Sequence, residues 1–166
     1  MRRGGKWVKV GPGGSDDTAA ATMFLGEFEH TLDEKNRLTL PARFRESFPE
    51  GLVVTRGMDG CLYAYARADW DRLVESRLAN LDLLSRDDRM IQRYFFSAAV
   101  EAAPDKQGRI MLPAALVDHG GLGREVVVAG VHDHLEIWDR AAWRALVKEV
   151  EGRAEHVAER LAAKRD

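Results

Sequence analysis

A short motif that joins an acidic to a basic residue occurs twice in this chain of 166 residues. Asp33 and Arg37 are four positions apart, and the same spacing separates Asp105 from Arg109. An arginine at the tip of a turn presents a planar fork of donors that can clamp a phosphate or pair with guanine. An aspartate four residues earlier can accept N–H groups of the turn and hold the arginine in one orientation, which lowers the entropy cost of binding. The motif therefore predicts two anion-binding turns.

The simpler interpretation of the motif is structural. An aspartate and an arginine at this spacing are common, and each pair could do no more than stabilise its own hairpin. Lys35 and Lys106 lie inside the two turns and would add attraction to phosphate without reading a base sequence. Duplication alone does not separate the two interpretations, because a constraint of the fold would also be duplicated.

The two motifs belong to a longer repeat. Residues 33–42 align with residues 105–114 without a gap, and the pattern Arg-x-x-Leu-Pro-Ala recurs in register. Asn36 matches Gly108 at the point where a tight turn favours a left-handed backbone. After one inserted residue, the match continues through apolar strand positions and aromatic residues. A repeat of this kind predicts that the protein is built from two copies of one supersecondary unit.

The repeat also predicts the domain organisation. One copy of about 55–70 residues would bury too little surface to be stable alone, so we expect the two copies to complete one core. Residues 1–22 are rich in Gly, Ala and basic residues and are expected to be a disordered leader, with Met23 as a candidate for the true start. The expected segments are the leader 1–22, a first repeat 23–78, a connecting helical segment 79–95, a second repeat 96–150, and a helix end and tail 151–166.

Each copy is expected to contain a strand, the turn, a second strand, a short helix that begins at a proline, two further strands and a longer helix. The first strand, 23–32, would direct Phe24, Phe28 and Leu32 inward and Glu27 and Glu29 outward. The turn and the returning strand at 38–40 are expected to form a simple hairpin with the first strand. The other predicted elements are helix 41–48, strands 52–55 and 61–65, a helix capped by Asp69, helix 86–95, a strand that ends near Ala102, a helix from Pro113 to Gly120-Gly121, strands 125–129 and 135–138, and a last helix capped by Asp139. The fold class is α+β and rich in β-structure.

The last predicted helix carries an apolar seam. Its members alternate four and three residues apart, which is typical of a helix that packs along a partner. A neighbouring subunit is one possible partner. The alternative is packing on the helix's own domain, with fraying after Val157. The seam residues are Trp143, Val147, Val150, Ala154, Val157 and Leu161.

Composition limits the class of protein. The net charge is −2 and 31% of residues are charged, so the chain is not globally basic, although phosphate contact depends on where positive groups lie. A single cysteine excludes an intrachain disulfide, and a cysteine-based zinc site would need more thiols. No apolar run approaches the ~18–20 residues that cross a bilayer. We therefore expect a soluble cytoplasmic protein without a cofactor.

The two motif copies, together with the opening Met-Phe-Leu-Gly-Glu-Phe-Glu-His at residues 23–30, resemble the MraZ family of bacterial transcriptional regulators. The resemblance covers about residues 23–157. It implies two tandem repeats, each similar to the swapped-hairpin fold of SpoVT-AbrB-type DNA-binding domains, joined as an intramolecular pseudo-dimeric β-barrel with flanking helices. It also implies a DNA-contacting role for the motif, which carries over to Asp33, Arg37, Asp105 and Arg109, beside which Lys35 and Lys106 would contact phosphates.

The resemblance further implies partners and a location. It implies a ring-shaped homo-oligomer, an octamer or dodecamer, associated with the nucleoid. The ring would bind direct repeats in double-stranded DNA ahead of the division and cell-wall gene cluster and act mainly as a repressor of its own operon. Arraying two turns per chain around a ring would compensate for the modest affinity of each turn.

Two other classes of function stay open. His132, His134 and Glu136 alternate along a predicted strand and would offer three metal ligands on one face, with His30 or His119 as a fourth, as in a metal-dependent enzyme. Alternatively, the duplicated turns could bind a protein, because 25 acidic residues exceed 21 basic residues from Met23 onward. Steep loss of binding with salt would favour DNA.

Overall fold

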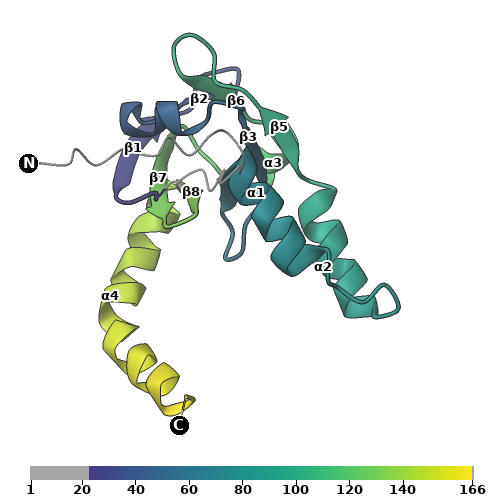
Figure 1. Cartoon of the computed structure of the whole chain (residues 1–166). Helices are drawn as coiled ribbons and strands as arrows, with labels where there is room; N and C mark the ends of the chain where they lie inside the picture. The colour runs from purple at the N-terminus through teal and green to yellow at the C-terminus, as the bar shows by residue number, and fades with distance from the viewer. Residues whose placement is uncertain (1–22, 166) are drawn as a thin grey trace, which may run out of the picture.

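The computed structural model describes residues 23–165, so the predicted leader 1–22 lies outside the described residues. The described chain alternates strands with short helices and ends in one long helix (Figure 1). The first half contains β1 (Glu27–Thr31), β2 (Arg37–Thr39), the 3-10 helix η1 (Ala42–Ser47), β3 (Leu52–Arg56), β4 (Leu62–Ala66), α1 (Arg67–Leu73) and the π-helical η2 (Val74–Leu78). The second half contains α2 (Arg86–Phe96), β5 (Val100–Ala102), β6 (Arg109–Met111), α3 (Ala114–His119), β7 (Glu125–Val131), β8 (His134–Asp139) and α4 (Arg140–Ala163).

The first two strands of each copy pair with strands of the other copy, whereas β3 pairs with β4 and β7 pairs with β8 within a copy. Six strands form an antiparallel sheet in the order β1-β7-β8-β4-β3-β5, and β2 pairs with β6 in a separate ribbon. The first strand of each copy therefore joins the third strand of the other copy. The central strands β4 and β8 are related by the pseudo-two-fold symmetry of the copies. Leu62 lies opposite Ile137, and Ala64 lies opposite Leu135. The two tandem repeats form one intramolecular pseudo-dimer.

The simple hairpin predicted around the first turn is wrong. Strand β1 lies beside β7, and only an isolated bridge between Leu32 and Leu38 links the two arms of the turn within the copy. The closed barrel that the resemblance implied is also absent from the described sheet, because β1 and β5 lie at opposite edges and do not pair. The strands β2 and β6 pair with each other instead of closing it.

One continuous core joins the copies. Phe24 is fully buried, its ring stacks on Phe48 at 5.5 Å between centroids, and it meets Phe44 edge-on. Phe28 and Leu32 also pack on this core, whereas Glu27 and Glu29 are exposed, as predicted for the first strand. The same cluster contains Leu38, Leu40, Ile110, Leu112, Val126, Val128, Leu135 and Ile137. Because both copies contribute, neither half retains this core alone.

The helix boundaries follow the predictions with two exceptions. The second copy's short helix ends at Gly120-Gly121, and Gly121 has a φ of +54°. Asp69 does not cap α1, because the chain passes directly from β4 into the helix and Ala66 takes the cap position. Asp69 lies in the first turn instead, buried, with Arg72 Nη2 2.7 Å from its carboxylate. Helix α4 also does not fray after Val157, since it continues to Ala163.

Asp139 caps α4 as predicted, accepting a hydrogen bond from the backbone N–H of Ala142. Within residues 23–165, no helix is both long enough and apolar enough to cross a membrane.

Candidate nucleic-acid interface

The carboxylate of Asp33 organises the first turn. Its Oδ1 accepts hydrogen bonds from the backbone N–H groups of Lys35 and Arg37, each at 2.9 Å. Its Oδ2 accepts a hydrogen bond from Nε of Arg37 at 2.6 Å. Asn36 has a φ of 56°, and its N–H donates to the carbonyl of Asp33 at 3.0 Å. One aspartate therefore fixes both the backbone of the turn and the direction of the guanidinium.

The second turn repeats this geometry. Oδ1 of Asp105 accepts the backbone N–H groups of Gln107 and Arg109 at 2.9 Å each, and Oδ2 accepts Nε of Arg109 at 2.9 Å. Gly108 has a φ of 75° and replaces Asn36 in the left-handed position. The second turn also has an additional hydrogen bond, which Nη2 of Arg109 donates to Oε1 of Gln107 at 2.6 Å.

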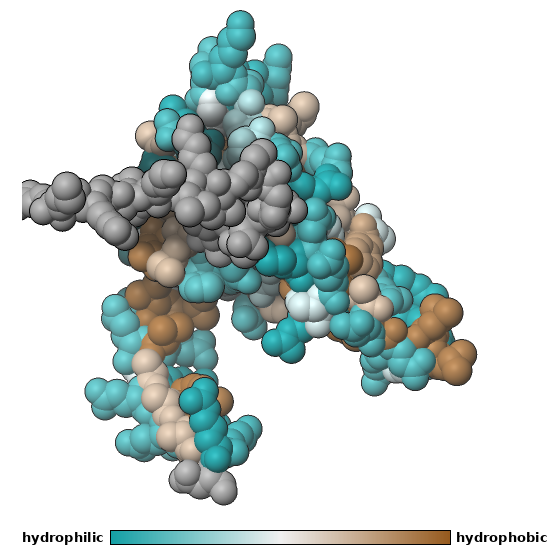
Figure 2. All heavy atoms as spheres, viewed as in Figure 1, coloured by the Kyte–Doolittle hydropathy of each residue, from teal (hydrophilic) through white to brown (hydrophobic). Residues whose placement is uncertain are grey.

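The two turns are tied to each other. In the β2–β6 ribbon Leu38 lies opposite Ile110, and both side chains are buried. The N–H of Leu40 donates to the carbonyl of Gly108 at 2.8 Å, and the N–H of Leu112 donates to the carbonyl of Asn36 at 2.9 Å. The pair of turns is thus a rigid unit at the end of the molecule away from α2 and α4 (Figure 1). Hydrophilic residues cover this end in the view of Figure 2.

Both aspartates are charged at neutral pH. The hydrogen bond from the backbone N–H of Arg37 is the main cause that lowers the pKa of Asp33, against the opposing effect of desolvation. The same causes, with Arg109 as donor, lower the pKa of Asp105. Each arginine therefore faces a permanent counter-ion that orients it without covering it.

The arginines keep donors open to solvent. The side chains of Arg37 and Arg109 are 33% and 28% exposed, and Lys35 and Lys106 are exposed. Among the described residues, neither terminal nitrogen of Arg37 donates to a protein acceptor, and Arg109 has one terminal nitrogen without such an acceptor. All six candidate residues thus lie at one end, in two clusters that can donate hydrogen bonds to phosphates or base edges.

Another arginine, Arg45, lies beside the second turn although it is not part of the motif. It belongs to η1, and its Nε donates to the carbonyl of Leu40 at 3.1 Å. No sequence signal links it to the turn, because the contact depends on the pairing between copies.

The histidines of the metal hypothesis do not form a metal site. Within residues 23–165, no group of three or more His, Cys, Asp or Glu side chains is placed to hold a metal ion. His132 occupies a turn with a φ of 64°. His134 instead stacks on Tyr65, with ring centroids 5.0 Å apart, and contacts Asp133 Oδ1 at 2.7 Å and Glu136 Oε2 at 3.4 Å.

This setting of His134 predicts a pH-dependent stability. Burial of the ring opposes protonation, but hydrogen bonds to Glu136 and Asp133 outweigh it and raise the pKa of His134 above its ordinary 6.5. A raised pKa adds stability that is complete below pH 6.5 and is lost as the pH rises through the folded-state pKa. We expect the free energy of unfolding to fall over that range in denaturant titrations of the wild type. His134→Gln should lack this component, and equal pH profiles for the two proteins would contradict the assignment.

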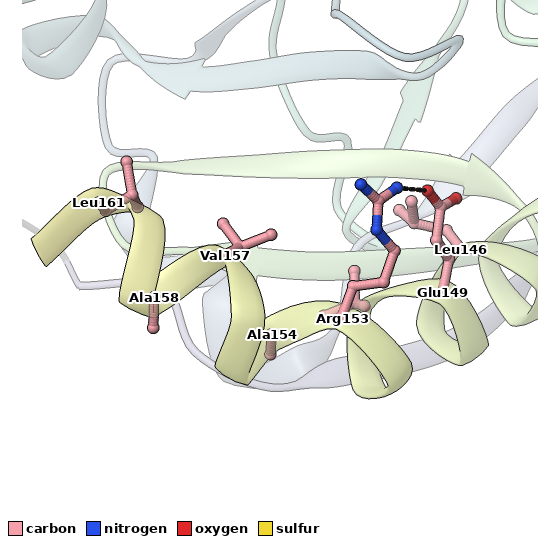
Figure 3. Close-up of a pocket in the computed structure, with 8 residues that line it drawn as sticks. Leu146, Glu149, Arg153, Ala154, Val157, Ala158 and Leu161 are labelled. Carbon is pink, nitrogen blue, oxygen red and sulfur yellow. Dashed lines mark hydrogen bonds and ion pairs between the residues drawn. The ribbon is translucent and has the colours of Figure 1, made fainter. Parts of the chain in front are cut away.

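Helix α4 carries a second candidate surface. Its first turns pack on the sheet, where Nε1 of Trp143 donates to Glu27 at 2.5 Å. Its later turns have no packing partner among residues 23–165, and Val150 and Leu161 are more than half exposed. An open groove of about 460 Å³ follows this part of the helix. The side chains of Leu146, Val157 and Leu161 point to the same side of the helix (Figure 3). The other residues that line it are Glu149, Val150, Arg153, Ala154 and Ala158.

A further apolar patch lies at the turn before α2. Leu83 and Leu84 are 71% and 87% exposed there. Figure 2 shows hydrophobic side chains both along α4 and at this distant tip. Within residues 23–165, these two exposed apolar surfaces both lie away from the paired turns.

Comparison with known proteins gives one consistent match. The family model described as "MraZ protein, putative antitoxin-like" matches the chain twice, over residues 23–94 and 95–165. A protein named transcriptional regulator MraZ from Ligilactobacillus salivarius is 45% identical over 139 residues, which cover 84% of this chain and 96% of the relative. Proteins of the same name from Pediococcus pentosaceus, 44% identical with the same coverage, and Roseiflexus castenholzii, 41% identical over 84% of this chain and 97% of the relative, agree.

These relatives are named as regulators of transcription rather than as enzymes. The two matched segments correspond to the two structural copies, each with its own Asp-x-x-x-Arg turn. The chain therefore belongs to the MraZ family.

Proposed function

We propose that this protein is a sequence-specific DNA-binding transcriptional regulator that contacts duplex DNA through its two Asp-x-x-x-Arg turns. The observation that supports this most is the matched pair of guanidinium groups, each oriented by its own aspartate and each with donors open to solvent. The proposed contacts are Arg37 and Arg109 to bases or phosphates and Lys35 and Lys106 to phosphates, with Asp33 and Asp105 as orienting residues.

The charge distribution supports DNA contact through the turns alone. From Met23 onward the chain has more acidic than basic residues, so the rest of the surface does not attract a polyanion. A rigid pair of turns loses little conformational entropy on binding. Their position at one end would allow contact while the acidic remainder stays away from the duplex.

The proposed targets are direct repeats upstream of the protein's own operon in the division and cell-wall gene cluster, where the protein would act mainly as a repressor in the nucleoid. The name that the relatives carry supports regulation of transcription. Two weak contacts per chain would need several chains on repeated boxes to reach useful affinity.

We further propose that the chains assemble into a ring, an octamer or dodecamer. A ring needs a head-to-tail contact between two different patches on each subunit. The α4 groove and the Leu83-Leu84 tip are two such patches. Both lie away from the paired turns, so assembly would leave the turns free.

The α4 groove gives a test of assembly. Val157→Lys with Leu161→Lys places two charges where the proposed contact excludes water, and we expect the oligomer to dissociate to monomers in light scattering after gel filtration. His156→Lys, on the same helix but outside the groove lining, should leave the assembly intact. A charged double variant with the wild-type mass would eliminate α4 as the contact.

Footprinting the region upstream of the gene tests the function itself. We expect protected boxes spaced by about one helical turn of DNA, ~10 base pairs, because successive turns on one face of a ring would meet the same face of the duplex. If no box is protected at protein concentrations at which the oligomer is fully assembled, the proposal is contradicted and a protein-binding module is favoured.

A further inference from the structure

Arg45 lies directly on the second turn. A methyl group added to Gly108 would come within 2.7 Å of Cδ and 2.9 Å of Cζ of Arg45. The hydrogen bond from its Nε to the carbonyl of Leu40 fixes the side chain in this position. The glycine thus leaves room for a guanidinium from the first copy beside the turn of the second copy. In Figure 1 the blue helical segment that follows β2 lies at the same end as the β2–β6 ribbon.

The positive charge of Arg45 is not neutralised within the described chain. Arg45 is exposed, and no carboxylate among residues 23–165 lies within ion-pair distance of it. The Nε of Arg45 donates to the carbonyl of Leu40. Its two terminal nitrogens therefore remain available to donate to a ligand. His30 does not add a second positive charge at neutral pH, because burial and then Arg45 itself lower the pKa of this histidine.

The second copy has no cation at the position that matches Arg45. The position that matches Arg45 in the second copy is Val117 in α3, which packs against the core. Residues 33–37 contain two acidic and two basic residues, whereas residues 105–109 contain one acidic and two basic residues. With Arg45 beside it, the second turn has the greater positive charge by two units. The pseudo-two-fold symmetry of the fold is therefore broken at this surface.

We propose that Arg45 and the Asp105–Arg109 turn form one phosphate-contacting site, so that the second turn of each chain holds the DNA backbone more strongly than the first. This inference rests on the proposed function. The difference between the two turns would also fix the orientation in which each chain lies along the duplex. A symmetric pair of contacts suits a palindrome, whereas a direct repeat requires a reader whose two ends differ.

The test is the salt dependence of binding to the upstream duplex. Each phosphate contact contributes a slope of about −0.9 in log K against log salt. Arg45→Val introduces the side chain that the second copy has, and we expect the slope to become shallower by about 0.9 for each engaged subunit. Affinity at ~0.1 M salt should fall by about five- to tenfold for one engaged subunit. Arg45→Lys should retain most of the slope, because the charge remains.

Two controls separate the possible outcomes. Arg77→Ala removes an exposed arginine from η2 and should leave the slope unchanged. If Arg45→Val weakens binding without changing the slope, Arg45 only supports the turn and the inference is overturned. If wild type and Arg45→Val bind alike and both depend steeply on salt, the inference fails while the proposed function stands. If the wild type does not bind the duplex, both fail.

Discussion

Replacing Arg37 and Arg109 together by alanine is expected to reduce affinity for the upstream duplex by at least about 30-fold. A bidentate contact from arginine to a base contributes about 1–3 kcal/mol of discrimination, and the two contacts occur once each in every chain. The loss of affinity should be larger for the upstream duplex than for a scrambled duplex. A gel-shift titration with the two duplexes measures this difference. The fold should persist, because each aspartate still accepts two backbone N–H groups.

Replacing the same two arginines by lysine is the matched comparison. Lysine keeps the charge but cannot form the planar fork, so this variant should retain non-specific binding and lose preference for the specific duplex. Thermal unfolding of all variants checks the fold. Unchanged affinity in the double alanine variant, with an intact fold, would eliminate the turns as the DNA contact.

Leu38→Ala is expected to cost about 2–5 kcal/mol of the free energy of unfolding, as large-to-small substitutions in a core do. Leu38 is fully buried and lies opposite Ile110 at the centre of the ribbon that holds both turns. The cavity would lie beneath both turns at once, so DNA affinity should fall even under conditions where the variant remains folded. Urea denaturation followed by circular dichroism measures the first effect.

Met111→Ala is the control for this substitution. Met111 is in the same ribbon, but it is 65% exposed. Its replacement should change stability by no more than about 0.5 kcal/mol. Equal effects at the two positions would contradict the view that the ribbon is anchored through its buried face.

The local structure of the turns was predictable from sequence. An aspartate that accepts backbone N–H groups, followed by Asn36 or Gly108 at a positive φ, is specified by residues close in the chain. The inward positions Phe24 and Leu32 likewise follow from alternation along the first strand. The roles of the turn residues in DNA contact stay predictions.

The pairing of strands was not predictable from local pattern. A turn between two short apolar strands is compatible with two arrangements. Its two arms can pair with each other, or each arm can pair with a strand of the other copy. The core decided the outcome, since pairing β1 with β7 and β2 with β6 buries Phe24, Leu38 and Ile110 together. The position of Arg45 beside Gly108 depends on the same exchange, so no sequence motif could reveal it.

The start of α1 and the end of α4 were also not predictable from local pattern, because they depend on the neighbouring strand and on tertiary packing. Asp69 is a good cap residue by type, but the absence of a loop after β4 starts the helix three residues earlier, with Ala66 as the cap. The sequence of α4 left two partners open for its apolar seam, a neighbouring subunit and the helix's own domain, and the structure shows packing on its own domain for the first turns only. Trp143 packs on the sheet, whereas the seam around Val157 continues as helix without a partner among the described residues.

We propose that two basic turns carry an otherwise acidic protein onto specific duplex DNA. Fluorescence anisotropy of the wild type with the upstream duplex and a scrambled duplex, each at salt concentrations from ~50 to ~200 mM, tests it most directly. We predict tighter binding to the upstream duplex at every salt concentration and a steep fall in affinity as salt increases. Equal affinity for the two duplexes, or affinity that does not change with salt, would contradict the account.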